Sequence, residues 1–341
     1  MRRTTIREVA VRAGVSHQTV SRVINKSPFV AAATRTQVLR AIAELDYHPN
    51  ANAVGLSRDR SDIVGLVVES VTSPFFAQII AGVEQGLRDH GRHLLLGSTH
   101  GAPQIEAITE LLHSRRIDGM IVVLPTTSSA DQTQQLVQSG VPTVLVDVHD
   151  DVPANTIGVD NHSGAHSATD YLIRLGHRRI GLITGRSDVL VSQIRVSGYR
   201  SALRQHAIRF DPGLIIPGDF SDASGRRAVD QLMALAAPPT AIFACSDEMA
   251  LGALGALLQR GVNVPDDISV VGYDDIPQAS ICHPTLTTVR QPLVEMGQLA
   301  SHTICRIIDE PGQPAMRAVM GTRLIERGST TWARRREGVA G

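Results

Sequence analysis

The spacing of apolar and polar positions changes near residue 60 and divides this chain into two parts. Before that point, apolar residues recur every three or four positions, which predicts short amphipathic helices. After Asp62, continuous apolar runs alternate with amphipathic stretches, which predicts strands alternating with helices. The runs that predict strands are Ile63–Val68, His93–Gly97, Gly119–Leu124, Thr143–Asp147, Ile180–Gly185, Ala241–Asp247 and Ile268–Asp275. Runs of this kind are typical of strands buried on both faces, so we expect an α/β fold with two doubly wound parallel sheets.

The first 47 residues predict three short helices. Thr5 and Glu8 have the spacing of a capping box, Gly14 breaks the first helix, and Ser16 can cap the second. Pro49 is expected to end the third helix. The apolar positions expected to form a small core are Ile6, Val9, Ala10, Ala13, Val20, Val23, Ile24, Val38, Ala41, Ile42 and Leu45.

The first two of these helices, with a glycine in the turn between them, have the order of a helix-turn-helix motif. In that motif the second helix buries one face and presents short polar side chains to the edges of the bases. Glutamine can pair with adenine, arginine can grip guanine with two bonds, and hydroxyl groups serve phosphates. The polar positions of the second helix are His17, Gln18, Thr19, Ser21, Arg22 and Asn25. Taken alone, this pattern also fits an ordinary surface helix.

The distribution of charge favours the DNA-binding interpretation. Residues 1–60 contain ten Lys and Arg against four Asp and Glu, which gives +6, and the remainder of the neutral chain is therefore −6. A basic head on an acidic body suggests that the head meets a polyanion. Chance asymmetry in a short segment is the alternative.

Other features of the composition exclude several classes of protein. The absence of a run of about 18 apolar residues predicts no membrane span. Residues 1–10 lack the apolar segment of a secretory signal, so we expect a cytoplasmic protein. Cys245, Cys282 and Cys305 lack metal-binding spacing and are expected to be reduced thiols that pack in the core.

The segment "TIREVAVRAGVSHQTVSRVIN" resembles the lactose/galactose repressor family, whose pattern is T-hydrophobic-x-x-V-A-x-x-A-G-V-S-x-x-T-V-S-R-V-x-N. The resemblance continues through "SPFFAQIIAGVE", "GHRRIGLITG", "SDEMALGAL", "ISVVGYDDI" and "PTLTTVRQP" and covers nearly the whole chain. It implies a repressor that binds a palindromic operator as a homodimer joined through its core. It also implies allosteric control by a small effector and no cofactor.

The resemblance also implies a division of the chain into a head, a hinge and a core. The all-α helix-turn-helix head is 1–48, the hinge helix and linker are 49–61, and the effector-binding and dimerisation core is 62–341. The core is similar to periplasmic sugar-binding proteins and has two lobes. Their implied bounds are about 62–160 plus 291–322 for the N-lobe and about 161–290 plus 323–333 for the C-lobe.

For DNA, the resemblance places His17, Gln18 and Arg22 at base-reading positions and Leu56 where the family inserts a leucine into the minor groove. The full set of implied DNA contacts is Thr5, Ser16, His17, Gln18, Thr19, Ser21, Arg22, Asn25, Asn50, Ala53 and Leu56. His17 departs from the residues common at its position, so the operator is expected to differ there. Ala31 replaces a frequent capping Ser or Thr, which puts the start of the third helix in doubt.

For the effector, the resemblance points to residues that follow strands and lie at a crossing between lobes. They are Ser73, Phe75, Asp147, Arg195, Phe220, Ser246, Asp274 and Gln291. Carboxylates and arginine can bind neighbouring hydroxyls, and an aromatic ring can cover the apolar face of a sugar, so a carbohydrate effector is expected. Ser246 stands where many sugar-binding relatives have Asn, and a purine or another small polar effector therefore remains an alternative. Asp147 could instead cap a helix or a turn, and both phenylalanines could be plain core.

Three other interpretations find less support in the sequence. His162 and His166 have the spacing of a zinc helix, but "HSGAH" lacks the glutamate of H-E-x-x-H, so no metal is expected. The chain contains no G-x-S-x-G, P-loop or Rossmann motif, which argues against a sugar-processing enzyme. A sugar-binding transport protein is the remaining rival, and the head motif argues against it.

We therefore expect an effector to close the lobes about crossings near Val159–Asn161 and Arg290–Gln291.

Overall fold

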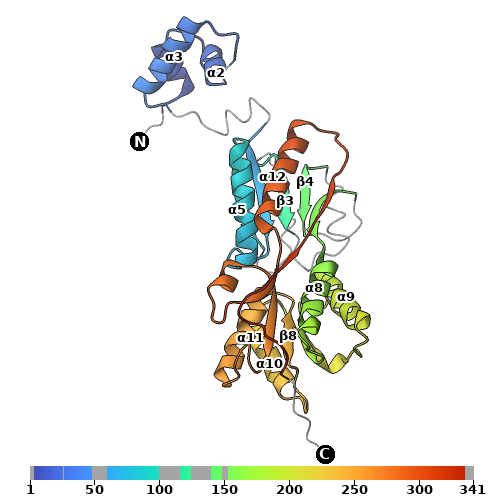
Figure 1. Ribbon diagram of the computed structural model, residues 1–341. Coiled ribbons are helices and arrows are strands. Elements are labelled where there is room, and N and C mark those ends of the chain that lie inside the picture. The colour runs from blue at the N-terminus through green and yellow to red at the C-terminus, as the bar shows by residue number, and fades with distance from the viewer. Residues whose placement is uncertain are drawn as a thin grey trace, which may run out of the picture. The chain divides into compact units, whose positions relative to one another are not determined.

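The computed structural model describes residues 4–25, 27–47, 60–99, 116–123, 140–147 and 153–334. Backbone contacts separate the chain into two compact units. One unit combines Met1–Ile63 with Leu111–Asp118, and the other combines Val64–Glu110 with Gly119–Gly341. The helices α1 to α3 belong to the first unit, and the two sheets lie almost entirely in the second (Figure 1).

The head contains the three predicted helices, α1 (Ile6–Arg12), α2 (His17–Ile24) and α3 (Ala32–Glu44). Thr5 and Glu8 form the predicted capping box, and the Ser16 hydroxyl accepts a hydrogen bond from the Thr19 backbone N–H at 3.1 Å. The predicted apolar positions meet in one small core, in which Val9, Val20 and Val38 are inaccessible to solvent and the others are buried or packed against them.

The third helix ends earlier than the sequence predicts, at Glu44 and not at Pro49. Asp46 takes a left-handed backbone conformation with φ of 45°. The N–H of Asp46 donates to the carbonyl of Ala43, and the N–H of Tyr47 donates to the carbonyl of Ile42. This bonding satisfies the last carbonyls of the helix without proline. At the other end, α3 begins after Ala31 with no side-chain cap.

The first sheet has six strands in the order β11-β5-β4-β3-β1-β2. Strands β1, β3, β4, β5 and β11 pair in parallel. The strands are β1 (Ile63–Val68), β2 (His93–Ser98), β3 (Gly119–Val123), β4 (Thr143–Val146), β5 (Asn155–Val159) and β11 (Arg317–Met320).

The second sheet also has six strands, in the order β12-β10-β9-β8-β6-β7. All its pairs are parallel except the edge pair β10–β12, which is antiparallel. The strands are β6 (Ile180–Thr184), β7 (Ile215–Pro217), β8 (Ala241–Ala244), β9 (Ser269–Asp274), β10 (Thr287–Arg290) and β12 (Arg323–Ile325). Two parallel-dominated sheets with helices confirm the predicted fold class.

All seven predicted strands are present, although β2 is not buried on both faces as predicted. Leu95 and Leu96 are 40% and 41% exposed, because β2 lies at the edge of its sheet. The sequence analysis also missed β5, β7, β10, β11 and β12. Several of these are short or carry polar residues, so their apolar signal is weak.

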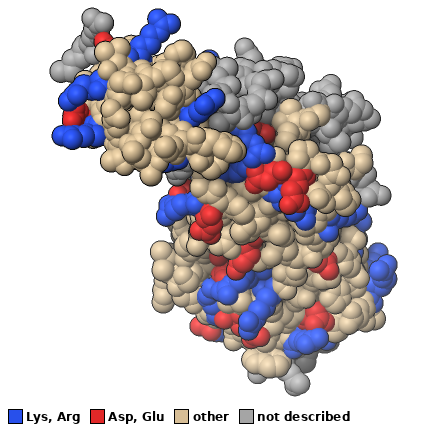
Figure 2. Space-filling view, turned by 90° about the horizontal axis from the view of Figure 1, so that it is seen from above, with Lys and Arg blue, Asp and Glu red and all other residues tan. Residues whose placement is uncertain are grey.

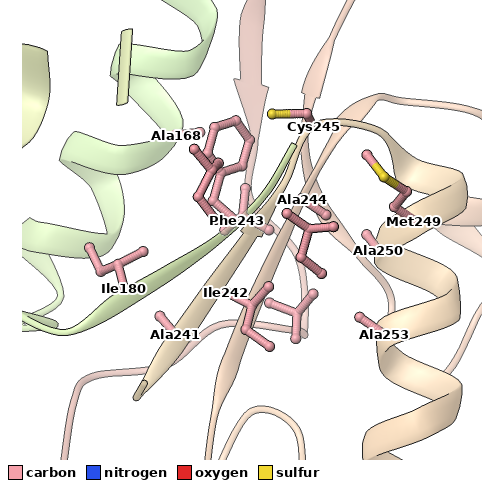
Figure 3. Close-up of a cluster of buried hydrophobic side chains, with 14 of the residues drawn as sticks. Ala168, Ile180, Ala241, Ile242, Phe243, Ala244, Cys245, Met249, Ala250 and Ala253 are labelled. Carbon is pink, nitrogen blue, oxygen red and sulfur yellow. The ribbon is translucent and has the colours of Figure 1, made fainter. Parts of the chain in front are cut away.

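Within the described ranges, six long helices pack against these sheets. They are α5 (Pro74–Asp89), α8 (Asn161–Arg174), α9 (Leu190–Gln205), α10 (Asp222–Met233), α11 (Asp247–Gln259) and α12 (Leu293–Asp309). In the second sheet, Ala168 of α8 lies on one side of β8, and Ala250 and Ala253 of α11 lie on the other (Figure 3). The sheet is therefore covered on both faces, as a doubly wound fold requires.

Two further predictions concern membrane-spanning helices and the state of the cysteines. None of the described helices is long and apolar enough to cross a bilayer. All three cysteines are free thiols, and Cys245 and Cys305 are fully buried in the apolar clusters of the two sheets, as predicted. Cys282 is only half-buried and packs against the second cluster.

Glycines bring pairs of helices into backbone contact within each sheet layer. A Cβ atom on Gly82 of α5 would lie 2.0 Å from the carbonyl oxygen of Val294 in α12, and one on Gly297 would lie 2.3 Å from that of Ile79. Gly225 and Gly252 join α10 to α11 in the same reciprocal way. These helices are therefore held at a separation that any larger residue would increase.

Gly82→Ala is expected to destabilise the folded protein by about 1–3 kcal/mol, because α5 and α12 must separate to admit the new methyl group. The midpoint of thermal unfolding measures this loss. Gly321→Ala is the matched control, since a Cβ atom there would meet nothing within 4 Å. Equal unfolding temperatures for the two variants would contradict the interpretation.

Candidate DNA-binding head and effector pocket

The outer face of α2 presents the polar side chains that the sequence analysis singled out. His17, Gln18 and Arg22 are exposed, while Val20 and Val23 are buried against the other two helices. Gln18 and Arg22 are four residues apart, so they lie on the same face of the helix. Thr19, Ser21 and Asn25 are half-buried at the edges of this face.

The other residues proposed for DNA contact differ in their surroundings. Thr5 and Ser16 are exposed, and their hydroxyls accept hydrogen bonds that cap α1 and α2. Asn50, Ala53 and Leu56 lie outside the described residues.

Arg22 differs from two of its neighbours in the head by its lack of a charged partner. Arg12 and Arg40 both form ion pairs with Glu44, and the Arg35 guanidinium donates to the carbonyl of Ser27. Within the described part of the head, no acidic side chain pairs with Arg22. Basic side chains project from the surface of the head (Figure 2). Arg22 is exposed and can approach a polyanion without first breaking an ion pair with a described residue.

A cavity of about 260 Å³ lies in the second unit and is bordered by residues that follow strands of both sheets. Seven of the eight residues proposed for effector binding line it, namely Ser73, Phe75, Asp147, Arg195, Phe220, Ser246 and Asp274. Gln291 does not line the cavity, but it is buried and its side-chain amide donates to Asp274 at 2.6 Å.

Several contacts hold Arg195 in the cavity wall. Its side chain is 3% exposed, and its guanidinium lies 3.8 Å from the centre of the Tyr273 ring. Its Nε donates to the side chain of Asn161 at 2.8 Å, and its Nη1 donates to the carbonyl of Cys245. Bonds from several directions fix the planar group, so its donors are oriented before any ligand arrives.

Asp274 is the carboxylate that faces this arginine. The distance between the Arg195 Nη1 and the Asp274 Oδ1 is 3.9 Å, and both side chains are buried. Burial raises the pKa of Asp274 to about 7, and the opposite charge of Arg195 and the hydrogen bond from Gln291 limit that rise. Its backbone has a φ of 121°, an arrangement that non-glycine residues rarely adopt and that the surrounding bonds must hold.

The turn after β9 is braced by two acidic residues, Asp247 and Asp275, that do not line the cavity. Asp247 is fully buried, accepts from Thr288 at 2.5 Å and accepts from the N–H of Ile276 at 2.9 Å. Asp275 accepts from Arg327 at 2.7 Å and also pairs with Arg290.

Asp247 and Asp275 therefore hold the turn that follows Asp274 without lining the cavity themselves. Acidic residues directly after "ISVVGY" and at the start of α11 were the available signal. Their positions along the chain do not show which of them turn inward.

Glu248 is a residue of the cavity wall that sequence reasoning missed. It lines the cavity, and its Oε1 accepts a hydrogen bond of 2.5 Å from the Ser73 hydroxyl. Burial raises the pKa of Glu248. Ser73 precedes α5 of the first sheet layer and Glu248 belongs to α11 of the second, so this bond joins the two layers across the cavity.

The aromatic and hydroxyl groups of the site also make contacts that support the local structure. Phe75 packs edge-to-face on Phe76 with ring centres 5.1 Å apart. The Phe220 ring covers Gly185, where a Cβ atom would lie 2.0 Å from the ring. The Ser246 hydroxyl caps α11 by accepting from the N–H of Met249 at 3.2 Å. Asp147, which follows β4, has a φ of 61° and borders the cavity.

A helix-turn-helix head and a two-sheet core with a polar cavity define one class of protein, the DNA-binding regulator that responds to a small ligand. Comparison with known families agrees with this class. Residues 5–50 match the model for "Bacterial regulatory proteins, lacI family", and residues 169–330 match the model for a "Periplasmic binding protein-like domain".

Individual relatives match almost the whole chain. The ribose operon repressor of Escherichia coli (strain K12) is 37% identical over 327 residues, which are 95% of this chain and 99% of the relative. The lac repressor dimer bound to operator and the anti-inducer ONPF has a TM-score of 0.87 and 30% identity, covering 97% of this chain and 100% of that one. A complex of the transcriptional regulator CelR with cellobiose has a TM-score of 0.74 and 36% identity, covering 96% and 100%. This chain belongs to the lacI family of bacterial regulatory proteins and is a DNA-binding transcriptional regulator, not an enzyme.

Proposed function

We propose that this regulator is a repressor that binds a palindromic operator as a homodimer and that a small polyhydroxyl effector, a sugar or sugar derivative, controls its affinity for DNA. The observation that carries the effector proposal is the Arg195–Asp274 pair at the wall of the cavity. The arginine offers hydrogen-bond donors and the carboxylate offers acceptors, so neighbouring hydroxyls of one ligand can satisfy both. The relatives support this choice, since one is named for a ribose operon and another is complexed with cellobiose.

The proposed division of labour follows the order of the chain. Residues 1–48 bind DNA, 49–61 form the hinge, and 62–341 bind the effector and the second subunit. Within the head, Gln18 and Arg22 read bases, and capping groups such as Ser16 hold α2 against phosphates. Because DNA is the partner, the proposed site of action is the cytoplasm.

The chain passes between the two sheets in three places, and these offer a route for the effector's signal. One passage follows β5 at Asp160, the second follows β10 at Gln291, and the third links β11 to β12 at Gly321–Thr322. Gln291 is bonded to Asp274 in the cavity wall, so the state of the cavity affects a passage directly. A ligand that binds one arrangement of the layers more tightly than another shifts the population between them.

Selection of DNA from a random library with the full-length protein tests the proposal, followed by titration of sugars against the selected complex. We expect a palindromic sequence, a dimer on each site, and release by at least one sugar. Selection of sequences without two-fold symmetry would contradict dimeric operator binding. Selected complexes that no small polar compound alters would contradict control by an effector.

A further inference from the structure

The charge of the cavity wall narrows the kind of effector that the proposed function would use. Among the residues that the structure describes, five carboxylates and two guanidinium groups border the cavity. They are Glu69, Asp147, Asp219, Glu248 and Asp274 on the acidic side and Arg186 and Arg195 on the basic side. A wall of this composition attracts hydrogen-bond donors and positive charge and opposes an additional anion.

The two arginines are already compensated by groups of the protein. Arg186 binds Asp188 with two bonds, Nε to Oδ1 at 3.2 Å and Nη2 to Oδ2 at 2.8 Å. Arg195 faces Asp274 and donates to Asn161 and Cys245. Phosphate sites use arginine forks whose charge the phosphate itself neutralises. Neither arginine of the described wall offers an uncompensated charge of that kind.

Glu248 occupies a position where a bound anion would otherwise be favoured. It lies in the first turn of α11, and its partner Ser73 is the residue before the first turn of α5. The beginnings of helices carry partial positive charge and attract phosphates and carboxylates. Because Glu248 is held there by the 2.5 Å bond from Ser73, a carboxylate of the chain already meets this charge.

We infer that the cavity selects an uncharged or cationic effector and rejects its phosphorylated counterpart, and that Glu248 is the residue that determines this selectivity. The inference rests on the proposed function, because it specifies the ligand of the same cavity. A hydroxyl or an ammonium group donates to the carboxylates of the wall. A phosphate monoester brings about two negative charges beside Glu248, and both arginines of the described wall are already paired.

Thermal unfolding of the full-length protein with matched pairs of compounds tests this inference. The pairs are ribose and ribose 5-phosphate, glucose and glucose 6-phosphate, glucosamine and glucosamine 6-phosphate, and adenosine and AMP. A bacterial metabolite extract divided by anion exchange extends the panel beyond these compounds. We expect unphosphorylated compounds or the unretained fraction to raise the unfolding temperature. We expect the phosphate ester of any compound that binds to have a dissociation constant at least about tenfold higher.

The outcomes of this panel are decisive in either direction. A phosphate ester that stabilises more than its parent, or stabilisation by the retained anionic fraction alone, would overturn the charge selectivity. A lack of stabilisation by any compound or fraction would overturn it as well. Operator binding is measured separately without ligand. Release of the operator by a phosphate ester would therefore refute the charge rule and leave the proposed repressor intact. Failure to bind an operator would refute the repressor alone.

The Glu248→Gln variant tests the role of that residue. Glutamine keeps the shape and an acceptor for Ser73 but removes the charge, so discrimination against the phosphate ester should fall by about tenfold. Glu84→Gln is the matched control, since Glu84 lies on α5 outside the cavity, has a side chain that is 46% exposed and pairs with Arg88. Glu248→Ala, which removes the same charge, serves if the first variant does not fold. Unchanged discrimination in a folded Glu248→Gln protein would show that this residue is not the determinant.

Discussion

Asp274→Ala is expected to weaken effector binding by about hundredfold or more while leaving operator affinity unchanged. Asp274 is the proposed acceptor for neighbouring hydroxyls of the effector, and each hydrogen bond to a charged group contributes about 1.5–3 kcal/mol, so the loss of two costs about hundredfold or more in affinity. Here Arg195 would lose the carboxylate that lies 3.9 Å away, and the amide of Gln291 would lose its acceptor. Titration of effector against an operator complex measures both properties in one experiment. A variant that responds normally would show that Asp274 is not a ligand-binding group.

Asp274→Asn separates charge from shape at this position. Because the pKa of the wild-type carboxyl is raised to about 7, its ionised fraction falls as the pH drops below 7. The Asn side chain does not titrate in this range. The effector affinities of wild type and variant should therefore differ most at pH 8 and converge toward pH 5.5. A constant difference across this range would indicate that ionisation of Asp274 plays no part in binding.

Arg22→Ala is expected to reduce affinity for the selected operator by roughly 5- to 150-fold, which corresponds to the 1–3 kcal/mol of a good arginine–guanine contact. Arg22 is exposed on the outer face of α2 and has no acidic partner within the described part of the head. A gel-shift titration at fixed salt concentration measures the change. The head should remain folded, because Val20 and Val23 hold α2 in place.

Arg40→Ala is the control for Arg22. It removes the same charge from the head, but Arg40 lies on α3 and pairs with Glu44. We expect this variant to lose little operator affinity and to keep the preference of the wild type among operator sequences. Equal losses in both variants would mean that Arg22 contributes only general electrostatic attraction.

The sequence predicted the strongest features of the fold because those features have local causes. The capping residues Thr5 and Ser16 act within one turn of helix, and the buried strands of both sheets are continuous apolar runs. The edge strands β7 and β12 have three residues each, and their pairing depends on partners distant in the chain. Such strands carry too little local signal to be predicted.

Part of the cavity was also predictable from the sequence. The resemblance carried over positions that follow strands, and seven of those eight border the cavity. Glu248 was missed because its role depends on Ser73, which lies 175 positions earlier in the chain. The close helix pairs were missed because a glycine in an amphipathic helix does not show in the sequence which backbone approaches it.

The glycine-mediated helix contacts have a mechanical consequence. Helices whose backbones touch cannot slide or separate without breaking many contacts at once, so each layer resists deformation as a stiff body. Compliance is then concentrated in the three passages between the sheets, which are single strands of backbone. The binding free energy of an effector therefore drives rotation about those passages and does not distort the layers themselves. Because the helix pairs are stiff, a ligand that is only a few ångströms across would displace a whole domain.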